Sequence, residues 1–144
     1  VKASAGLTDL TSIVKTSDYQ DERLAATMSL GFIGDKKSVP ILNQLLEDDE
    51  PNIRWDAAIA LAKMGERTCI PIIRNLMDRE YLTTFPELDY NEVTKVLLIA
   101  IETSSIIKDN LFEPPLIALA NSDEDLTIRN AAIKTLENSY NRTL

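Results

Sequence analysis

Two aspartates, each followed six residues later by an arginine, have types and a spacing that could do chemistry. Asp48 precedes Arg54, and Asp123 precedes Arg129. A carboxylate beside a guanidinium could act as a general acid or base next to a cation that stabilises developing charge. Because the arrangement recurs along the chain, we interpret both pairs as structural contacts between neighbouring turns rather than as catalytic groups.

Cys69 is a second candidate for chemistry. It lies at the start of an apolar segment that contains Pro71, and the dipole of a helix there could lower the pKa of the thiol. The 144 residues include no histidine, which excludes a histidine base, a histidine-centred triad and a histidine-ligated metal. We therefore interpret Cys69 as a small packed side chain. The sequence predicts no catalytic residue, no metal, no cofactor and no enzymatic activity.

Charge and hydropathy restrict the partners of the chain. Fifteen basic and 23 acidic residues give a net charge of −8, which argues against a nucleic-acid partner because such affinity comes largely from Lys and Arg. The longest apolar run, Val96–Ile101, is far shorter than the roughly 20 residues that cross a bilayer, so no membrane insertion is expected. The compartment stays open: the cytoplasm is favoured, but Ala3-Ser4-Ala5 could end a secretory cleavage site.

An internal repeat organises the chain. Residues 21–50 resemble residues 52–80 when one segment is shifted by 31 residues onto the other, and the shift aligns Gly34 with Gly65 and Pro40 with Pro71. Matching glycines and prolines at one offset are hard to produce by chance, because each marks a requirement of the backbone. The repeat therefore reflects a repeated structural unit, and the elements of this unit must position any functional side chain.

Each repeat unit predicts two helices. In the second unit, apolar residues recur at 53, 57, 60, 61 and 64, which is the spacing of one helical face. Gly65 marks the end of this helix, and Pro71 falls in the first turn of the next, where a missing N–H is tolerated. The acidic runs 47–50 and 123–125 precede helices and are expected to cap them. Further helices are predicted at 7–15, 92–107, 115–120 and 127–136.

Stacked helix pairs of this kind form an α-solenoid, because no pair can bury its apolar face alone. We predict an all-α fold of about four helix pairs, about eight helices and no sheet. The whole chain, 1–144, is interpreted as one repeat domain. Its units cover residues 1–17 (partial), 18–48, 49–80, 90–121 and 123–144 (partial), and an insertion occupies 81–90.

The repeat resembles the HEAT family. The resemblance is carried by Val39-Pro40, Leu45-Leu46, Ile53-Arg54, Ala57-Ala58, Leu61 and Gly65. It is closest to the short HEAT-like units that also occur in phycobilin lyases, and it covers roughly residues 7–140. It implies a protein-binding scaffold or adaptor whose partner is another protein or further repeats of the same chain. A small-molecule ligand is not expected. The alternative is a HEAT-like enzyme subunit such as a chromophore (phycobilin) lyase.

The resemblance also bears on individual residues. HEAT-like deoxyhypusine hydroxylase holds iron with His-Glu pairs, which a chain without histidine cannot copy. HEAT-like DNA glycosylases use a basic groove, and this acidic chain offers no obvious one. Family members pair an Asp with an Arg six residues later, which implies that both pairs described above form rungs of a ladder. In the first unit, Arg23 has only Ser17 and Asp18 nearby, and in the third unit Thr94 stands at the arginine position.

A row of polar residues on the second helices is the main candidate for partner binding. On the helix that contains Ile41 and Leu45, the polar side chains point away from the apolar stripe. The family's second helices line the concave surface, so these residues and their equivalents 31 positions later are expected to share a groove. Because the chain is acidic, a basic ligand is favoured, and lysine at Glu47 and Asp78 should slow association without changing stability. The row comprises Asn43, Gln44, Glu47, Arg74, Asn75 and Asp78.

Two other surfaces are candidates. Trp55 and Ile59 lie opposite the core stripe of their helix, and Leu24 and Met28 match them one unit earlier. This apolar patch predicts an interface, unless stacking between repeats buries it. The insertion, 81–90, brings three aromatic residues that either anchor a partner or, as we favour, fold back onto the chain.

Overall fold

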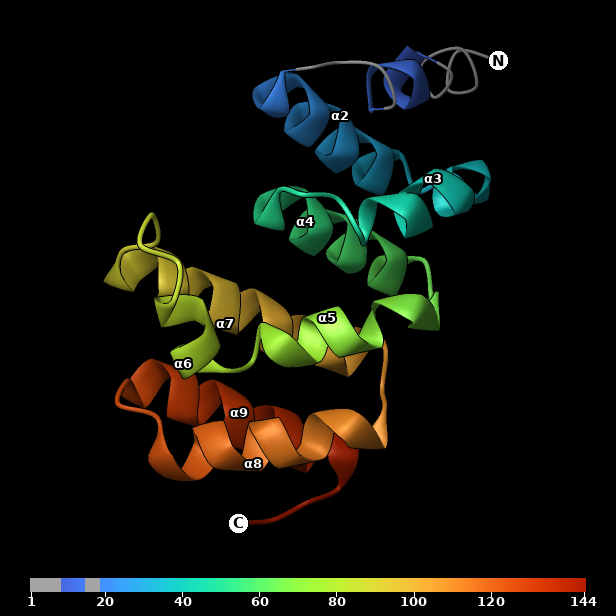
Figure 1. Ribbon diagram of the computed structural model, residues 1–144. Coiled ribbons are helices and arrows are strands. Elements are labelled where there is room, and N and C mark those ends of the chain that lie inside the picture. Colours follow the sequence, from blue (N-terminus) through green and yellow to red (C-terminus); the bar gives the residue numbers. More distant parts are fainter. Residues whose placement is uncertain (1–8, 15–18) are drawn as a thin grey trace. The chain divides into compact units, whose positions relative to one another are not determined.

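The computed structural model describes residues 9–14 and 19–144 of the chain (Figure 1). Within these ranges the chain forms helices and no strand, which confirms the predicted all-α class. Residues 9–14 are helical and fall within the helix predicted at 7–15, whose other residues lie outside the described ranges, as do Ser17 and Asp18. The labelled helices are α2 (Gln20–Ile33), η1 (Lys36–Ser38), α3 (Val39–Leu45), α4 (Pro51–Lys63), η2 (Arg67–Cys69), α5 (Ile70–Asn75), α6 (Arg79–Thr83), α7 (Tyr90–Ile106), η3 (Asn110–Phe112), α8 (Glu113–Ser122) and α9 (Leu126–Tyr140).

The chain divides into two compact units, residues 1–72 and 73–144, and the division falls within α5. In the first unit, α4 packs against both α2 and α3 (Figure 1). In the second unit, α9 packs against α7 and α8, and α6 packs against α7. Long first helices thus alternate with shorter second helices, as expected for an α-solenoid. That all of 1–144 forms one domain stays a prediction.

Two glycines end the first helices of successive repeats, as the sequence predicts. Gly34 follows α2 with a φ of 66°, and its N–H donates to the carbonyl of Leu30. Gly65 follows Met64, the last residue associated with α4, and has a φ of 79°. Both dihedrals lie in the left-handed region, where a side chain is strained. The expectation that both glycines lie at helix ends is therefore confirmed.

A third glycine allows α2 and α4 to approach closely. A Cβ atom placed on Gly31 would lie 2.7 Å from the Cβ of Ala60, which is shorter than carbon atoms tolerate. The pairing of the smallest residues brings the two backbones together and buries Leu30 and Leu61 completely. Contact between the first helices of neighbouring repeats therefore depends on Gly31, whose helix propensity alone would disfavour it.

Each second helix begins with a short 3₁₀ turn that the sequence analysis does not predict. The last residues of η1, η2 and η3 are Ser38, Cys69 and Phe112, and all three side chains are fully buried. The Ser38 hydroxyl donates to the carbonyl of Asp35, and the Cys69 thiol donates to the carbonyl of Glu66, in each case three residues back. The three residues are structural equivalents that anchor the turn in the core.

Among the described residues, no helix is both long and apolar enough to cross a membrane.

Candidate functional site

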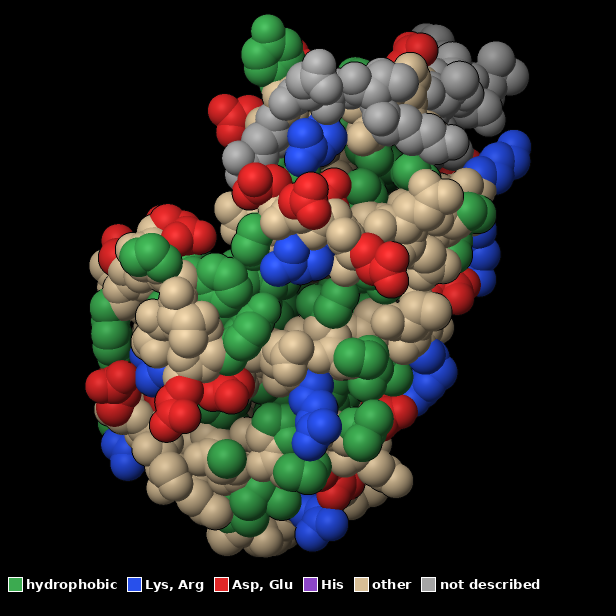
Figure 2. Space-filling view, viewed as in Figure 1, with side chains coloured by type: hydrophobic (Ala, Val, Ile, Leu, Met, Phe, Trp, Pro, Cys, Tyr) green, Lys and Arg blue, Asp and Glu red, His purple; other side chains and the backbone are tan. Residues whose placement is uncertain are grey.

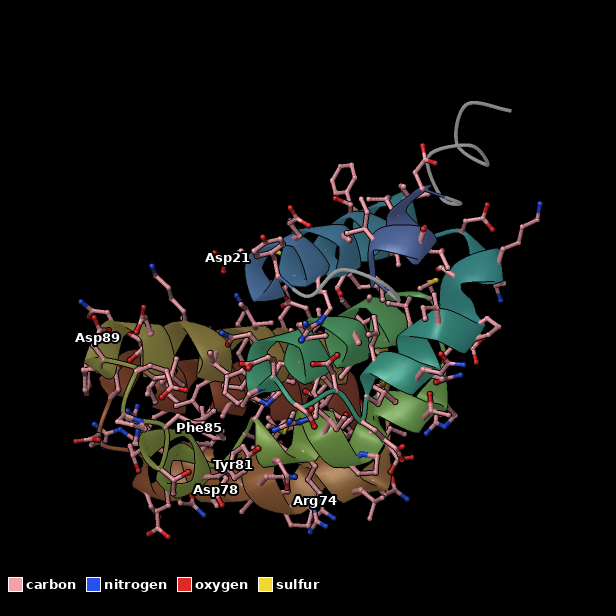
Figure 3. All side chains as sticks on the ribbon, turned by 45° about the horizontal axis from the view of Figure 1, so that its top comes forward. Asp21, Arg74, Asp78, Tyr81, Phe85 and Asp89 are labelled. Carbon is pink, nitrogen blue, oxygen red and sulfur yellow. The ribbon has the colours of Figure 1, made fainter. Side chains whose placement is uncertain are left out.

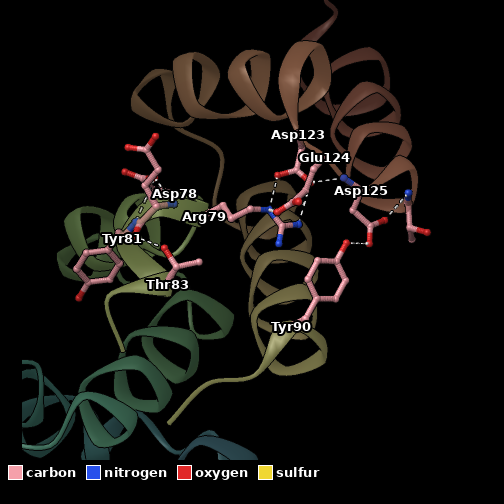
Figure 4. Close-up of polar contacts among 10 residues, drawn as sticks. Asp78, Arg79, Tyr81, Thr83, Tyr90, Asp123, Glu124 and Asp125 are labelled. Carbon is pink, nitrogen blue, oxygen red and sulfur yellow. Dashed lines mark hydrogen bonds and ion pairs between the residues drawn. The ribbon is translucent and has the colours of Figure 1, made fainter. Parts of the chain in front are cut away.

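Arg79 and Asp123 form the strongest ion pair of the second unit. The Arg79 Nε lies 2.8 Å from Asp123 Oδ1, and its Nη2 lies 2.9 Å from Oδ2, so the pair is bidentate (Figure 4). The Asp123 side chain is only 2% exposed and that of Arg79 14%. The hydrogen bonds to Asp123 raise the pKa of the Arg79 guanidinium. The expected pairing of Asp123 with Arg129 is wrong, because Arg79 occupies both carboxylate oxygens.

The pairing expected in the first unit is also wrong. The Asp48 carboxylate lies 3.4 Å from Nη2 of Arg23 rather than beside the Arg54 guanidinium. Arg54 instead donates to two carbonyl oxygens, at 2.7 Å on Asp48 and 3.2 Å on Asp49. The side chain of Arg54 therefore stabilises the turn before α4, and the Asp48 carboxylate pairs with Arg23 of its own repeat unit, 18–48. The ion pair between Arg79 and Asp123, in contrast, joins residues of two repeat units.

Tyr90 and Asp125 extend the polar cluster around Arg79. The Tyr90 hydroxyl donates to Asp125 Oδ2 at 2.9 Å, and the Arg79 guanidinium lies 5.3 Å from the centre of the Tyr90 ring. The hydrogen bond from Tyr90 lowers the pKa of Asp125, and the same bond raises the pKa of Tyr90. Asp125 also caps α9 by accepting from the Thr127 N–H, as the sequence predicts for this acidic run. The cluster fixes the start of α7 to the start of α9.

A groove of about 650 Å³ lies beside this cluster, within the second unit. One wall comes from the end of α5 and the start of α6, and the other comes from α8. Its volume is in the range of ligand-binding pockets. Arg74, Asn75 and Asp78, three residues of the predicted polar row, all line it; Arg74 and Asp78 are labelled in Figure 3. The other lining residues are Met77, Arg79, Glu80, Pro114, Pro115, Ala118, Leu119, Ser122, Asp123 and Glu124.

Asp78 has a structural role besides lining the groove. Its carboxylate accepts from the N–H groups of Glu80 and Tyr81, at 2.9 and 3.3 Å, and so caps α6 (Figure 4). Loss of such a cap costs about 1 kcal/mol. The expectation that lysine at Asp78 leaves stability unchanged is therefore not supported, and Glu80 and Glu124 are better positions for testing the charge of the groove.

The other three residues of the predicted row lie in the first unit. Asn43 is half-buried, and its Oδ1 accepts from the Thr68 hydroxyl at 2.6 Å. Gln44 and Glu47 are exposed. Asn43 therefore links α3 to η2, while the two exposed side chains are accessible to a partner. That these three residues share one groove with their equivalents in the second unit stays a prediction.

The apolar patch is only partly exposed. Met28 is 58% exposed, Leu24 and Ile59 are half-buried, and Trp55 is 6% exposed. The burial of Trp55 agrees with the alternative that stacking between repeats covers this side chain. The buried residues of α4 form more than one stripe, although Asn52 and Lys63 are exposed, because a helix within a stack is covered on more than one side. Met28 is accompanied instead by Phe32, one turn later on α2, which is 95% exposed.

The insertion folds back onto the second unit. Its first residues belong to α6, and Leu82 is fully buried. The rings of Tyr81 and Phe85 contact each other edge to face with centroids 5.3 Å apart (Figure 3). Both rings are half-buried, and Tyr90 makes the hydrogen bond to Asp125. These contacts agree with the favoured interpretation that the aromatic residues seal a local cluster.

Cys69 has none of the features of a reactive thiol. Its side chain is fully buried, and burial raises its pKa from 9.0 to about 11. The nearby Arg67 lowers that pKa, but by less than burial raises it. The interpretation of Cys69 as a packed side chain agrees with this environment and with its equivalence to Ser38 and Phe112.

We expect the Cys69 thiol to resist modification in the folded protein. At neutral pH its thiolate fraction should be about a hundredfold lower than that of a thiol with a pKa of 9.0. A thiol-specific disulfide reagent should therefore react slowly with the native chain and rapidly with the same chain in guanidinium chloride. Rapid reaction of the native chain at the unfolded rate would contradict the buried environment.

The sequence pattern does not indicate Arg79, Glu80 and Glu124, which line the groove, or Pro115 and Ala118, which line its other wall. Arg79 could have been found, since the 31-residue shift aligns it with Asp48. An arginine therefore stands at a position where the repeat has an aspartate, and this change of charge marks the residue as unusual. The α8 residues could have been found by aligning Pro114 with Pro71, which requires an offset of 43 because of the insertion.

The helix pairs, the glycine ends and the ion pair between repeats define a helical-repeat protein. The family model for HEAT repeats matches residues 7–83, more than half of the 144 residues. The chain belongs to the HEAT-repeat family, which confirms the resemblance seen in the sequence. HEAT repeats generally mediate protein–protein interaction. No curated protein matches the chain.

Proposed function

We propose that the chain is a non-enzymatic protein-binding scaffold and that the groove of the second unit receives its partner. The observation that carries this proposal is the groove itself, which is about 650 Å³ in volume and is lined by residues of two successive second helices, α5 and α8, and of the segments that follow them. Stacked repeats commonly bind partners on such regularly spaced helix surfaces. The partner is another protein or further repeats of the same chain.

The surroundings of the candidate chemical groups support a role without catalysis. Asp123 is neutralised by Arg79, Asp48 lies against Arg23, and Cys69 is buried with a raised pKa. Each group therefore has a structural contact or a buried environment. The net charge of −8 further favours a protein partner over nucleic acid, and the open groove between two helices suits a polypeptide better than a small molecule.

Photo-crosslinking tests this proposal directly. A photoreactive amino acid at Ala118, an exposed residue that lines the groove, should capture a defined protein in a lysate of the native source. The same amino acid at Asn138, exposed on α9 and outside the groove, is the matched control. Crosslinks of equal yield at both positions, or at Asn138 alone, would contradict the assignment of the groove as the partner site.

A further inference from the structure

The groove of the second unit combines an apolar floor with charged walls. Pro114, Pro115 and Ala118 supply apolar surface that is exposed or half-exposed, and the nearby Met77 and Leu119 are buried beneath it. Burial of such surface by a partner would supply hydrophobic stabilisation in proportion to its area. Because hydrophobic contacts are non-directional, the apolar floor does not select between ligands, and the choice of ligand depends on the charges around it.

These charges are unequal at the two ends of the groove. Arg79 is neutralised by the bidentate contact with Asp123, and its Nε lies 3.5 Å from Glu124, whose side chain is 64% exposed. Glu80 is exposed on the same wall as Asp78. The lining therefore holds four carboxylates and two guanidinium groups. Figure 2 shows acidic side chains gathered in the region of α6.

Arg74 gives the groove a direction. It is exposed, lies one helical turn before Asp78, and forms no ion pair with any described residue. The end of the groove near α5 is thus positive, whereas the end near α6 and the start of α9 is negative. A ligand with a basic group at one end and none at the other would bind in one orientation, since complementary charges fix register as well as partner choice.

We propose that the groove selects a polypeptide segment in which apolar side chains lie next to a lysine or arginine, with the basic side chain between Glu80 and Glu124. This inference rests on the proposed function and adds the chemistry of the partner. The apolar side chains cover Pro115 and Ala118, and Arg74 disfavours a second basic residue at the other end. The carboxylates at positions 80 and 124 determine specificity, while Asp78 and Asp123 hold the walls in place.

Labelled peptides provide the test on the full chain. Three probes carry the same leucines interspersed with lysine, glutamine or glutamate, and their affinities are measured by fluorescence anisotropy. The lysine probe should bind most tightly and the glutamate probe least. In the double variant Glu80→Gln, Glu124→Gln the affinity for the lysine probe should fall about fivefold, as expected for two exposed charge pairs. Arg74→Gln should have the opposite effect and strengthen binding of that probe.

A matched double variant separates the groove from the general field of an acidic protein. Glu102→Gln with Glu137→Gln removes the same charge from exposed positions on α7 and α9 that do not line the groove, so it should leave the affinity for the lysine probe nearly unchanged. Equal losses in both double variants, or equal binding of the three probes, would overturn the inference. If a protein is crosslinked at Ala118 with the same yield in the variant Glu80→Gln, Glu124→Gln, the inferred basic segment would be wrong, but the proposed function would still hold. Failure of crosslinking at Ala118 would remove both.

Discussion

Replacement of Phe112 by alanine should lower the free energy of unfolding by about 4 kcal/mol. Phe112 ends η3 and is fully buried, so its removal leaves a cavity as well as losing apolar contacts. Domains are stable by only about 5–15 kcal/mol, so the loss is about a quarter or more of the total free energy of unfolding. Urea denaturation followed by circular dichroism measures the loss.

The neighbouring residue provides the control. Leu111 lies in the same 3₁₀ turn but is 51% exposed, and its replacement by alanine should change the free energy of unfolding by about 0.5 kcal/mol or less. Similar losses for the two variants would mean that Phe112 does not anchor the turn in the core.

The repeat explains why the helices were predictable from the sequence. Glycine and proline mark backbone requirements that hold wherever they occur, so Gly34, Gly65, Pro40 and Pro71 locate helix ends and starts without knowledge of the packing. The 3₁₀ turns were not predictable in this way. Their anchors, Ser38, Cys69 and Phe112, share burial but not chemistry, and no sequence pattern connects three such different side chains.

Hydrophobic periodicity predicts which side chains of a helix are buried only when the helix is covered on one side. Periodicity identifies the stripe that faces a single neighbour, and it correctly places Ile53, Ala57 and Leu61 in the core. It also assigns Trp55 to the opposite, exposed face. The structure buries Trp55 and half-buries Ile59 on that face, because a helix inside a stack of repeats has neighbours on more than one side. The sequence of one helix does not contain this information.

The candidate groove was predictable only in part. The repeat offset relates the positions of Arg74, Asn75 and Asp78 to those of the preceding unit. This relation needs only the sequences of one helix and of its equivalent, so it could be predicted. The opposite wall is contributed by α8, about 40 residues away, and the insertion changes the offset. The partner of Asp123 is equally remote, since Arg79 precedes it by 44 residues. Side-chain pairing over that separation depends on how the helices pack, not on local spacing.

Removal of one partner of the ion pair between Arg79 and Asp123 should cost far more stability than the length of the pair alone suggests. In Arg79→Met, the Asp123 carboxylate, only 2% exposed, would keep its charge without the bidentate partner. Breaking a buried pair in this way costs about 3 kcal/mol. The double variant Arg79→Met, Asp123→Leu should recover much of the loss, because it leaves no buried charge uncompensated. A double-mutant cycle based on urea denaturation measures both effects.

Arg142 supplies a matched comparison within the same unit. Its Nε also lies 2.8 Å from a carboxylate, that of Glu113, but its side chain is 54% exposed. Because solvent screens this pair, Arg142→Met should cost about 0.5 kcal/mol, and the loss should shrink as salt is added. The loss in Arg79→Met should respond little to salt. If the two arginine variants lose equal stability, the pairing of Arg79 with Asp123 would not be the contact that holds α6 to the start of α9. If Arg129→Met is the more damaging change at Asp123, the pairing expected from the sequence would be correct.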